Sequence, residues 1–274
     1  MELKEIKANK EAIIKAKKNS IKSWVVNDFK PLRIKGLTNK ELPNDSDEVI
    51  FRQIVANSYY WMDSHDDVHV DGVFTKSIKE RGKYIGHFHD HMMRLDCKVG
   101  DTESIEEKIM SWADLGISKA GNTTVLLAVS KIKKDYNKSI FEQYKEGQIT
   151  QHSVGMQYIK MALAMNDESE VEEFKVWNQY IGQLGNSEKA IEKGYFWVIQ
   201  EAKLFEYSAV VMGSNELTPT KEESNLEGEI KNRFGEVKNL DQLCNLIALE
   251  SEAAQKALQE KQAATKKSIY SLLK

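Results

Sequence analysis

The chain has 274 residues, a formal net charge of −3 and 41% hydrophobic residues. This composition suits one soluble globular domain with additional segments, and it gives no electrostatic reason to expect nucleic acid as a partner. Cys97 and Cys244 lie far apart and form no CxxC pair, which disfavours a disulfide scaffold or a thiolate zinc site and favours a reducing compartment. No run approaches the roughly 18 apolar residues of a membrane span, and the N-terminus lacks the apolar core of a secretory signal. We therefore expect a cytoplasmic protein.

The N-terminal segment predicts a charged arm. Residues 2–22 place isoleucines near helical spacing among many lysines, which indicates a helix that docks on the body or on a partner. Pro31 and Pro43 frame a turn-rich linker that follows it. We assign residues 1–45 to this helical arm and linker.

The central region, residues 46–220, mixes strands and helices. Apolar runs rich in β-branched and aromatic residues predict strands, and amphipathic spacing with capping residues predicts helices. In the first half of this region we expect a strand or a bent pair of strands at 49–62, a turn at 63–67, a segment at 68–82 that ends in a short helix, and a strand at 84–93. A helix at 104–116 and a strand at 122–132 follow. The second half should contain a helix at 137–149, a strand at 151–164 bent at Gly155, helices at 170–185 and 187–194, and one or two strands at 195–215.

These elements lack the regular βαβ rhythm and the glycine-rich loop of a doubly wound sheet. An α+β fold, a mostly antiparallel β-barrel with peripheral helices, fits better. After Pro219 aromatic residues nearly vanish, and Leu243, Leu246 and Ile247 begin one helical stripe. We expect residues 221–274 to form a helical tail that docks on a partner surface or forms a short coiled coil.

Half of the six histidines lie in one stretch, GHFHDH, at residues 86–91. On a strand, His87, His89 and His91 would share one face, where three imidazoles could ligate zinc. The two-metal hydrolase pattern HxHxDH does not match, because Asp90 comes one position too early. A solvated histidine cluster and the base of a hydrolytic site stay open as alternatives.

Ser153 is the candidate nucleophile. It stands at the start of an apolar strand beside Gly155, and a serine hydroxyl needs an imidazole base within hydrogen-bond reach. The adjacent His152 would point to the opposite face of a regular strand. A histidine from the GHFHDH strand is a better geometric partner, and spacing alone does not choose between His87, His89 and His91.

Three blocks occur in an order that resembles the tailed-phage prohead (capsid maturation) serine protease family. The first is DSHDDVHVDGVFTKSIKERGKYIGHFHD, the second FEQYKEGQITQHSVGMQ, and the third EAKLFEYSAVVMGSNELTP. The positions that carry the resemblance are Asp63, Asp67, Gly72, Phe74, Ser77, His89 and Asp90, then Ser153 and Gly155, then Leu204, Glu206, Ser208, Val210 and Asn215.

The resemblance implies an assemblin-like fold, shared with herpesvirus maturation proteases, and a serine endopeptidase without metal or cofactor. It implies Ser153 as nucleophile, His89 as general base and Glu206 as the orienting acid. It further implies action inside a procapsid in the host cytoplasm, on scaffolding protein, on extensions of the major capsid protein and on the protease itself, with self-association and without nucleic acid or membrane.

Two alternatives remain. A zinc metallohydrolase would use His87, His89 and His91. A non-enzymatic procapsid core or scaffold protein would keep a degenerate protease fold, and the departures from the family pattern at Phe88, Met156 and Gly213-Ser214 favour it.

Overall fold

The computed structural model describes residues 3–22 and 42–221. The chain divides into two compact units, 1–223 and 224–274, and the described residues all belong to the first. Most of the predicted linker and, apart from Lys221, the predicted C-terminal tail lie outside the described residues. In the described ranges no helix combines the length and the apolar composition needed to cross a membrane.

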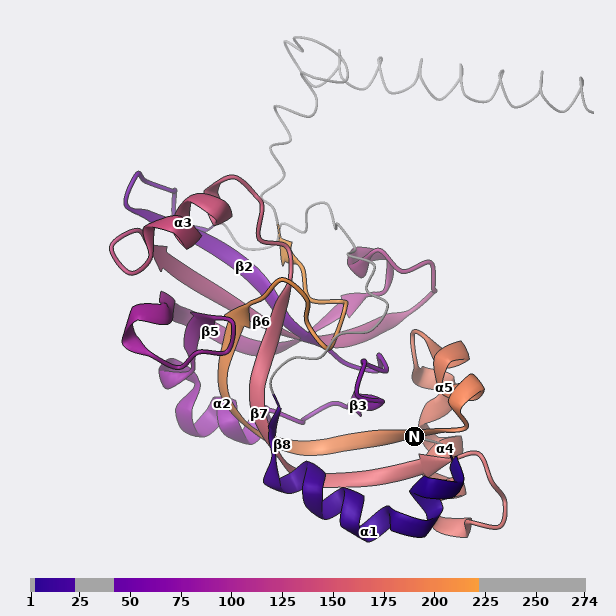
Figure 1. Cartoon of the computed structure of the whole chain (residues 1–274). Coiled ribbons are helices and arrows are strands. Elements are labelled where there is room, and N and C mark those ends of the chain that lie inside the picture. The colour runs from indigo at the N-terminus through magenta and orange to yellow at the C-terminus, as the bar shows by residue number, and fades with distance from the viewer. Residues whose placement is uncertain (1–2, 23–41, 222–274) are drawn as a thin grey trace, which may run out of the picture. The chain divides into compact units, whose positions relative to one another are not determined.

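One mixed sheet forms the centre of the first unit (Figure 1). Its strands pair in the order β1-β7-β8-β4-β5-β6-β2-β9, and β3 pairs with β8 on the same edge as β4. All ladders are antiparallel except β3–β8 and β4–β8. The strands are β1 (Ile21–Lys22), β2 (Val49–Ser58), β3 (Asp67–His69), β4 (Gly86–His89), β5 (Lys98–Ser111), β6 (Asn122–Lys133), β7 (His152–Met165), β8 (Tyr195–Ala209) and β9 (Thr220–Lys221).

The sheet is not closed into the barrel that the sequence predicts. Closure requires the two edge strands to pair with each other. Among the described residues, the edges of β7 and β2 each pair with a two-residue strand instead, β1 and β9, and those two do not pair with one another. The mostly antiparallel α+β class is confirmed, whereas the barrel is wrong.

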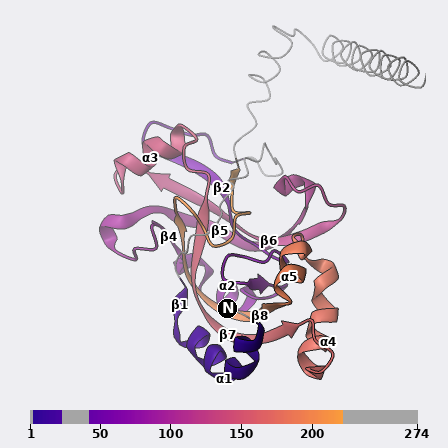
Figure 2. The same cartoon turned by 45° about the vertical axis from the view of Figure 1, so that its right-hand side comes forward.

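The helices are peripheral to this sheet (Figures 1 and 2). They are α1 (Leu3–Asn19), α2 (Thr75–Arg81), α3 (Lys138–Lys145), α4 (Val171–Tyr180) and α5 (Ser187–Lys193), with short 3₁₀ helices at Gly82–Tyr84, Leu95–Cys97, Ala113–Leu115 and Ile181–Gln183. α3, α4 and α5 confirm the helices predicted at 137–149, 170–185 and 187–194, and β7 and β8 confirm the long strands on either side of α4 and α5.

Strand β5 replaces the helix predicted at 104–116. The capping pattern Ser104-x-x-Glu107 is present, but Glu107 serves a different helix: its carboxylate accepts hydrogen bonds from the Phe74 N–H (3.1 Å) and the Thr75 hydroxyl at the start of α2. Tyr59 also donates to it at 2.6 Å. Tertiary contacts therefore override a local helix signal.

Strand β8 is buried on both faces along its first half. Tyr195 and Trp197 face the main core, and Phe196 and Val198 face a second cluster that includes Trp177 of α4. The Trp177 and Phe196 rings lie 5.3 Å apart. The segment carrying α4 and α5 thus covers a sheet face that would otherwise expose apolar side chains, which accounts for the continuous apolar run at 195–199.

Helix α1 docks on the body, as predicted for the arm. Ile6 is fully buried in the main core. Lys7, Lys10 and Lys17 form ion pairs with Asp167, Glu173 and Asp67, respectively. Strand β1, which follows directly, pairs with Met156 and Gln157 of β7.

Candidate functional site

The ladder between β7 and β8 brings three polar residues to one face of the sheet. Ser153 lies opposite Ser208, and Gly155 lies opposite Glu206. Directly opposed residues point their side chains to the same side, as do residues two apart on a strand. Ser153, Glu206 and Ser208 therefore share a face, and all three are buried: 5%, 1% and 0% of their surfaces are exposed.

His89 lies on the other face. Strand β4 pairs in parallel with β8 so that His87 matches Tyr207 and His89 matches Ala209, out of phase with Glu206 and Ser208. The His89 imidazole contacts the Asp90 carboxylate instead, Nδ1 to Oδ2 at 3.0 Å. The predicted partnership of His89 with Ser153 and Glu206 is therefore corrected by the register.

His91, unlike His89, lies on the sheet face that carries Glu206. Strand β4 ends at His89, and Asp90 and His91 adopt left-handed φ angles of 51° and 57°. Asp90 N–H donates to the Ala209 carbonyl oxygen at 2.9 Å, which fixes the turn against β8. The expectation that His87, His89 and His91 share one strand face is wrong, because the alternation ends where the chain leaves the strand.

The His91 imidazole pairs with the Glu206 carboxylate. Nδ1 lies 2.7 Å from Oε1, and the two side chains are 5% and 1% exposed. Ser208 ties this pair together: its hydroxyl donates to the other carboxylate oxygen, Oε2, at 2.5 Å and accepts the His91 N–H at 3.2 Å. The acid thus receives a hydrogen bond on each oxygen, and the imidazole is held at both its ring and its backbone.

This arrangement fixes the tautomer of His91. A carboxylate only accepts, so Nδ1 carries the proton and Nε2 is left with its lone pair. Among the described residues, the buried Nε2 has no hydrogen-bond partner, so it is not bonded to the Ser153 hydroxyl in this structure. The carboxylate thus orients the imidazole with its Nε2 lone pair available, on the sheet face that carries Ser153. Carboxylate–imidazole pairs of this kind orient the base in serine hydrolases.

Gly155 makes room for the acid. A Cβ atom at this position would overlap Glu206 Oε1 and approach its Cδ and Cγ to 2.9 and 3.1 Å. The ladder also shifts register between Gly155 and Met156, which confirms the bend predicted there. The glycine two residues after Ser153 is therefore required by the carboxylate on the neighbouring strand.

His87 and His152 belong to a buried hydrogen-bonded relay on the opposite face. His152 Nδ1 donates to the Thr218 carbonyl (3.1 Å), so its Nε2 accepts from the Tyr144 hydroxyl (2.7 Å). Tyr144 then accepts from His87 Nε2 (3.0 Å), and His87 Nδ1 accepts from the Ser130 hydroxyl (2.7 Å). Burial lowers the pKa of His152 to about 4. Burial and the nearby His152 hold the pKa of His87 well below its usual value.

The three histidines of GHFHDH thus diverge. His87 bonds Ser130 and Tyr144, His89 contacts Asp90, and His91 pairs with Glu206. Their imidazoles do not converge on a common point, so this stretch does not offer the three-histidine zinc site considered from the sequence.

Another potential ligand group, Asp63, His65 and Asp67, lies in the acidic turn. The Lys17 ammonium already forms an ion pair with Asp67 and donates to the His65 carbonyl oxygen at 3.1 Å. Asp63 accepts the backbone N–H groups of His65 (2.7 Å) and Asp67 (3.0 Å). The turn is therefore explained by internal bonding and by the docking of α1.

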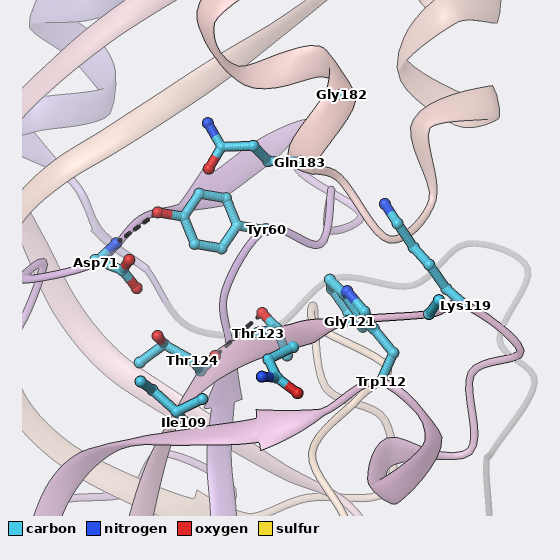
Figure 3. A pocket seen from close by; sticks show the side chains of 12 residues that line it. Tyr60, Asp71, Ile109, Trp112, Lys119, Gly121, Thr123, Thr124, Gly182 and Gln183 are labelled. Atoms are coloured by element: carbon cyan, nitrogen blue, oxygen red, sulfur yellow. Dashed lines mark hydrogen bonds between the residues drawn. The ribbon is translucent and has the colours of Figure 1, made fainter.

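A pocket of about 410 Å³ opens elsewhere, beside the end of the β5–β6 hairpin (Figure 3). Its wall includes Tyr60, Asp71, Trp112 and Lys119, and none of the candidate site residues. The Tyr60 hydroxyl accepts the Asp71 N–H at 3.4 Å, and the Lys119 ammonium donates to the Leu184 carbonyl oxygen. These polar groups already have partners, so the pocket adds no reactive group to the serine site.

The sequence resemblance names Ser153 and Glu206, which the structure places on one sheet face. It did not predict that His91 and Ser208 would both bond to Glu206 there. The sequence signal that could have indicated the position of His91 is Asp90, because aspartate tolerates the left-handed region and so can mark the end of a strand.

Comparisons with protein-family models, with curated proteins and with solved structures gave no match.

Proposed function

We propose that the protein is a serine endopeptidase in which Ser153 is the nucleophile, His91 the general base and Glu206 the acid that orients it. The observation that carries this proposal is the buried 2.7 Å pair between His91 Nδ1 and Glu206 Oε1, on the sheet face that carries Ser153. The pair leaves Nε2 as the atom able to take a proton.

In the proposed reaction Ser153 Oγ attacks the carbonyl carbon of a peptide bond while its proton passes to His91 Nε2. Glu206 stabilises the imidazolium that forms. The proton then moves to the leaving nitrogen as the C–N bond breaks, which leaves an acyl group on Ser153. Water, deprotonated by the same imidazole, hydrolyses this ester and regenerates the serine.

The biological setting follows from the sequence resemblance to prohead maturation proteases. The substrates would be scaffolding protein, extensions of the major capsid protein and the chain itself, inside a procapsid. An assemblin-like relationship is part of this proposal; the mostly antiparallel sheet with peripheral helices is compatible with it.

The test is labelling of the full chain with a fluorophosphonate, which reacts with activated serines, followed by peptide mapping. We expect the label on Ser153 and its loss in Ser153→Ala. His91→Ala should slow labelling by about 10³-fold or more, as expected when a triad base is removed. His89→Ala is the matched control and should label at the wild-type rate.

Two outcomes would reject the assignment. Labelling that depends on His89 but not on His91 would restore the base chosen by resemblance. No labelling of Ser153, together with full-length scaffolding and capsid proteins after co-expression with this chain, would favour the non-enzymatic alternative.

A further inference from the structure

Exposed apolar side chains occur in the two loops that follow β4 and β8, near His91 and Ser153. Among the described residues nine large apolar side chains are exposed, and four of them lie in the loops 90–97 and 210–219. Exposed apolar groups that cluster usually mark a contact surface. We name these four residues the apolar rim: Met92, Met93, Leu95 and Val211, which are 40%, 53%, 94% and 83% exposed.

The apolar rim borders both reacting groups. Met92 directly follows His91, and its loop is held to β8 by the hydrogen bond from Asp90 N–H to the Ala209 carbonyl oxygen (2.9 Å). On the other side, Val210 N–H donates to the Gln151 carbonyl oxygen at 3.1 Å. This bond places Val211 beside the start of β7, where Ser153 lies.

In the loop 90–97 the charged side chains have partners close by. Arg94 binds Asp96 through two nitrogens, at 3.0 and 2.7 Å, and Asp90 contacts His89 at 3.0 Å. A charged ligand group at the loop 90–97 would have to compete with these partners, whereas an apolar group would gain by covering the rim. Two of the rim residues are methionines, whose flexible side chains adapt to differently shaped apolar groups.

We infer that the apolar rim binds an apolar side chain of the polypeptide substrate close to the bond that is cut. This inference rests on the proposed endopeptidase function and adds a substrate class: extended chains with an aliphatic or aromatic residue beside the cleavage point. An endopeptidase must hold the chain on at least one side of its serine, and the rim is the apolar surface that the fold presents there.

The experiment exposes the full-length protein to a pool of proteome-derived peptides and reads the cut positions by mass spectrometry. We expect apolar residues to be enriched next to the cut. Val211→Ser should lower kcat/KM on the preferred peptides by about fivefold, mainly through KM, because the substrate covers Val211 only in part and a fraction of its transfer free energy is lost. Val171→Ser, a valine that is 69% exposed on α4, is the matched control and should leave cleavage unchanged.

Fluorophosphonate labelling of the wild-type chain separates the two possible failures. Absence of the label on Ser153 would reject the proposed serine endopeptidase function itself. A labelled protein that cuts no peptide would reject the endopeptidase function as well. A labelled protein that cuts without apolar preference, or whose cleavage is unaffected by Val211→Ser, would overturn the inference about the rim alone. A change of assembly mass in light scattering on Val211→Ser, with unchanged cleavage, would identify the rim as a self-association surface and would also overturn it.

Discussion

Ser208 contacts two parts of the candidate site at once, the Glu206 carboxylate and the His91 backbone. A buried carboxylate that loses a hydroxyl donor loses about 1.5–3 kcal/mol of interaction. Without Ser208, Glu206 is free to rotate away from His91 Nδ1. In the proposed mechanism Ser208 would therefore be a positioning residue, acting through Glu206 and His91.

Ser208→Ala should slow fluorophosphonate labelling of Ser153 by about 10- to 100-fold, the kinetic equivalent of that interaction. Ser130→Ala is the matched control, since Ser130 is an equally buried serine bonded to a histidine, His87, on the opposite face. Both variants should lose stability in urea titrations, but only Ser208→Ala should lose labelling. Equal labelling rates in the two variants would contradict the positioning role.

At the scale of elements, the turn after β4 decides which histidine reaches the sheet face that carries Ser153 and Glu206. Both Asp90 and His91 have left-handed φ angles, a conformation that costs most non-glycine residues roughly 1–2 kcal/mol and β-branched residues more. The turn persists because its backbone is bonded to Ala209 and Ser208. The His91 imidazole is therefore positioned by the turn that follows β4 and not by the strand itself.

Asp90→Val should disturb this turn, lower the thermal unfolding midpoint and abolish most labelling, because a β-branched residue cannot adopt the conformation without strain. Asp90→Asn, which tolerates the left-handed region, should retain both properties. Circular dichroism melts and labelling rates of the two variants provide the measurement. Equal behaviour of the two variants would show that the turn does not govern the position of His91.

This turn also explains how much of the site the sequence could predict. The apolar runs at 122–132, 151–164 and 195–215 identified long strands, because burial dictates their composition. The same alternation rule failed at GHFHDH, since it assumes a strand that continues through His91. The register between β4 and β8, which separates His89 from Ser153, depends on pairing between segments more than 100 residues apart, and no local pattern encodes it.

At the scale of the whole molecule, the relay of Ser130, His87, Tyr144, His152 and Thr218 connects β6, β4, α3, β7 and the loop before β9. Each imidazole acts as donor at one nitrogen and acceptor at the other, so protonating either one breaks a bond in the relay. A fall in pH that protonates His87 or His152 therefore weakens the contacts between these elements.

Stability should fall as the pH drops from about 6.5 to about 4. The pKa values of His87 and His152 are depressed in the folded state, so below the ordinary histidine pKa of about 6.5 the unfolded chain binds protons that the folded chain does not. His152 alone accounts for about 3 kcal/mol of the free energy of unfolding over this interval. Urea titrations at pH 7, 5.5 and 4.5 measure the effect.

His152→Gln should lower stability at pH 7 but flatten this pH dependence, whereas His89→Gln should leave the slope of stability against pH intact.

Carboxylates affect stability over a different, more acidic pH range. Burial opposes the shift at Asp101, but hydrogen bonds from Lys133 and Lys98 outweigh it and lower its pKa to about 2, so its contribution is lost only below pH 4. A pH slope confined to that acid range would contradict the role given to the relay.

The close approach of Glu206 to Gly155 has an evolutionary consequence. The volume beside Gly155 is shared between β7 and β8, so the residues at positions 155 and 206 should covary. A chain of this architecture with alanine in place of the glycine should carry the shorter aspartate in place of the glutamate, and its histidine loop should be displaced toward β8 to meet it. An alignment that pairs alanine with glutamate would indicate that the acid has moved to another strand.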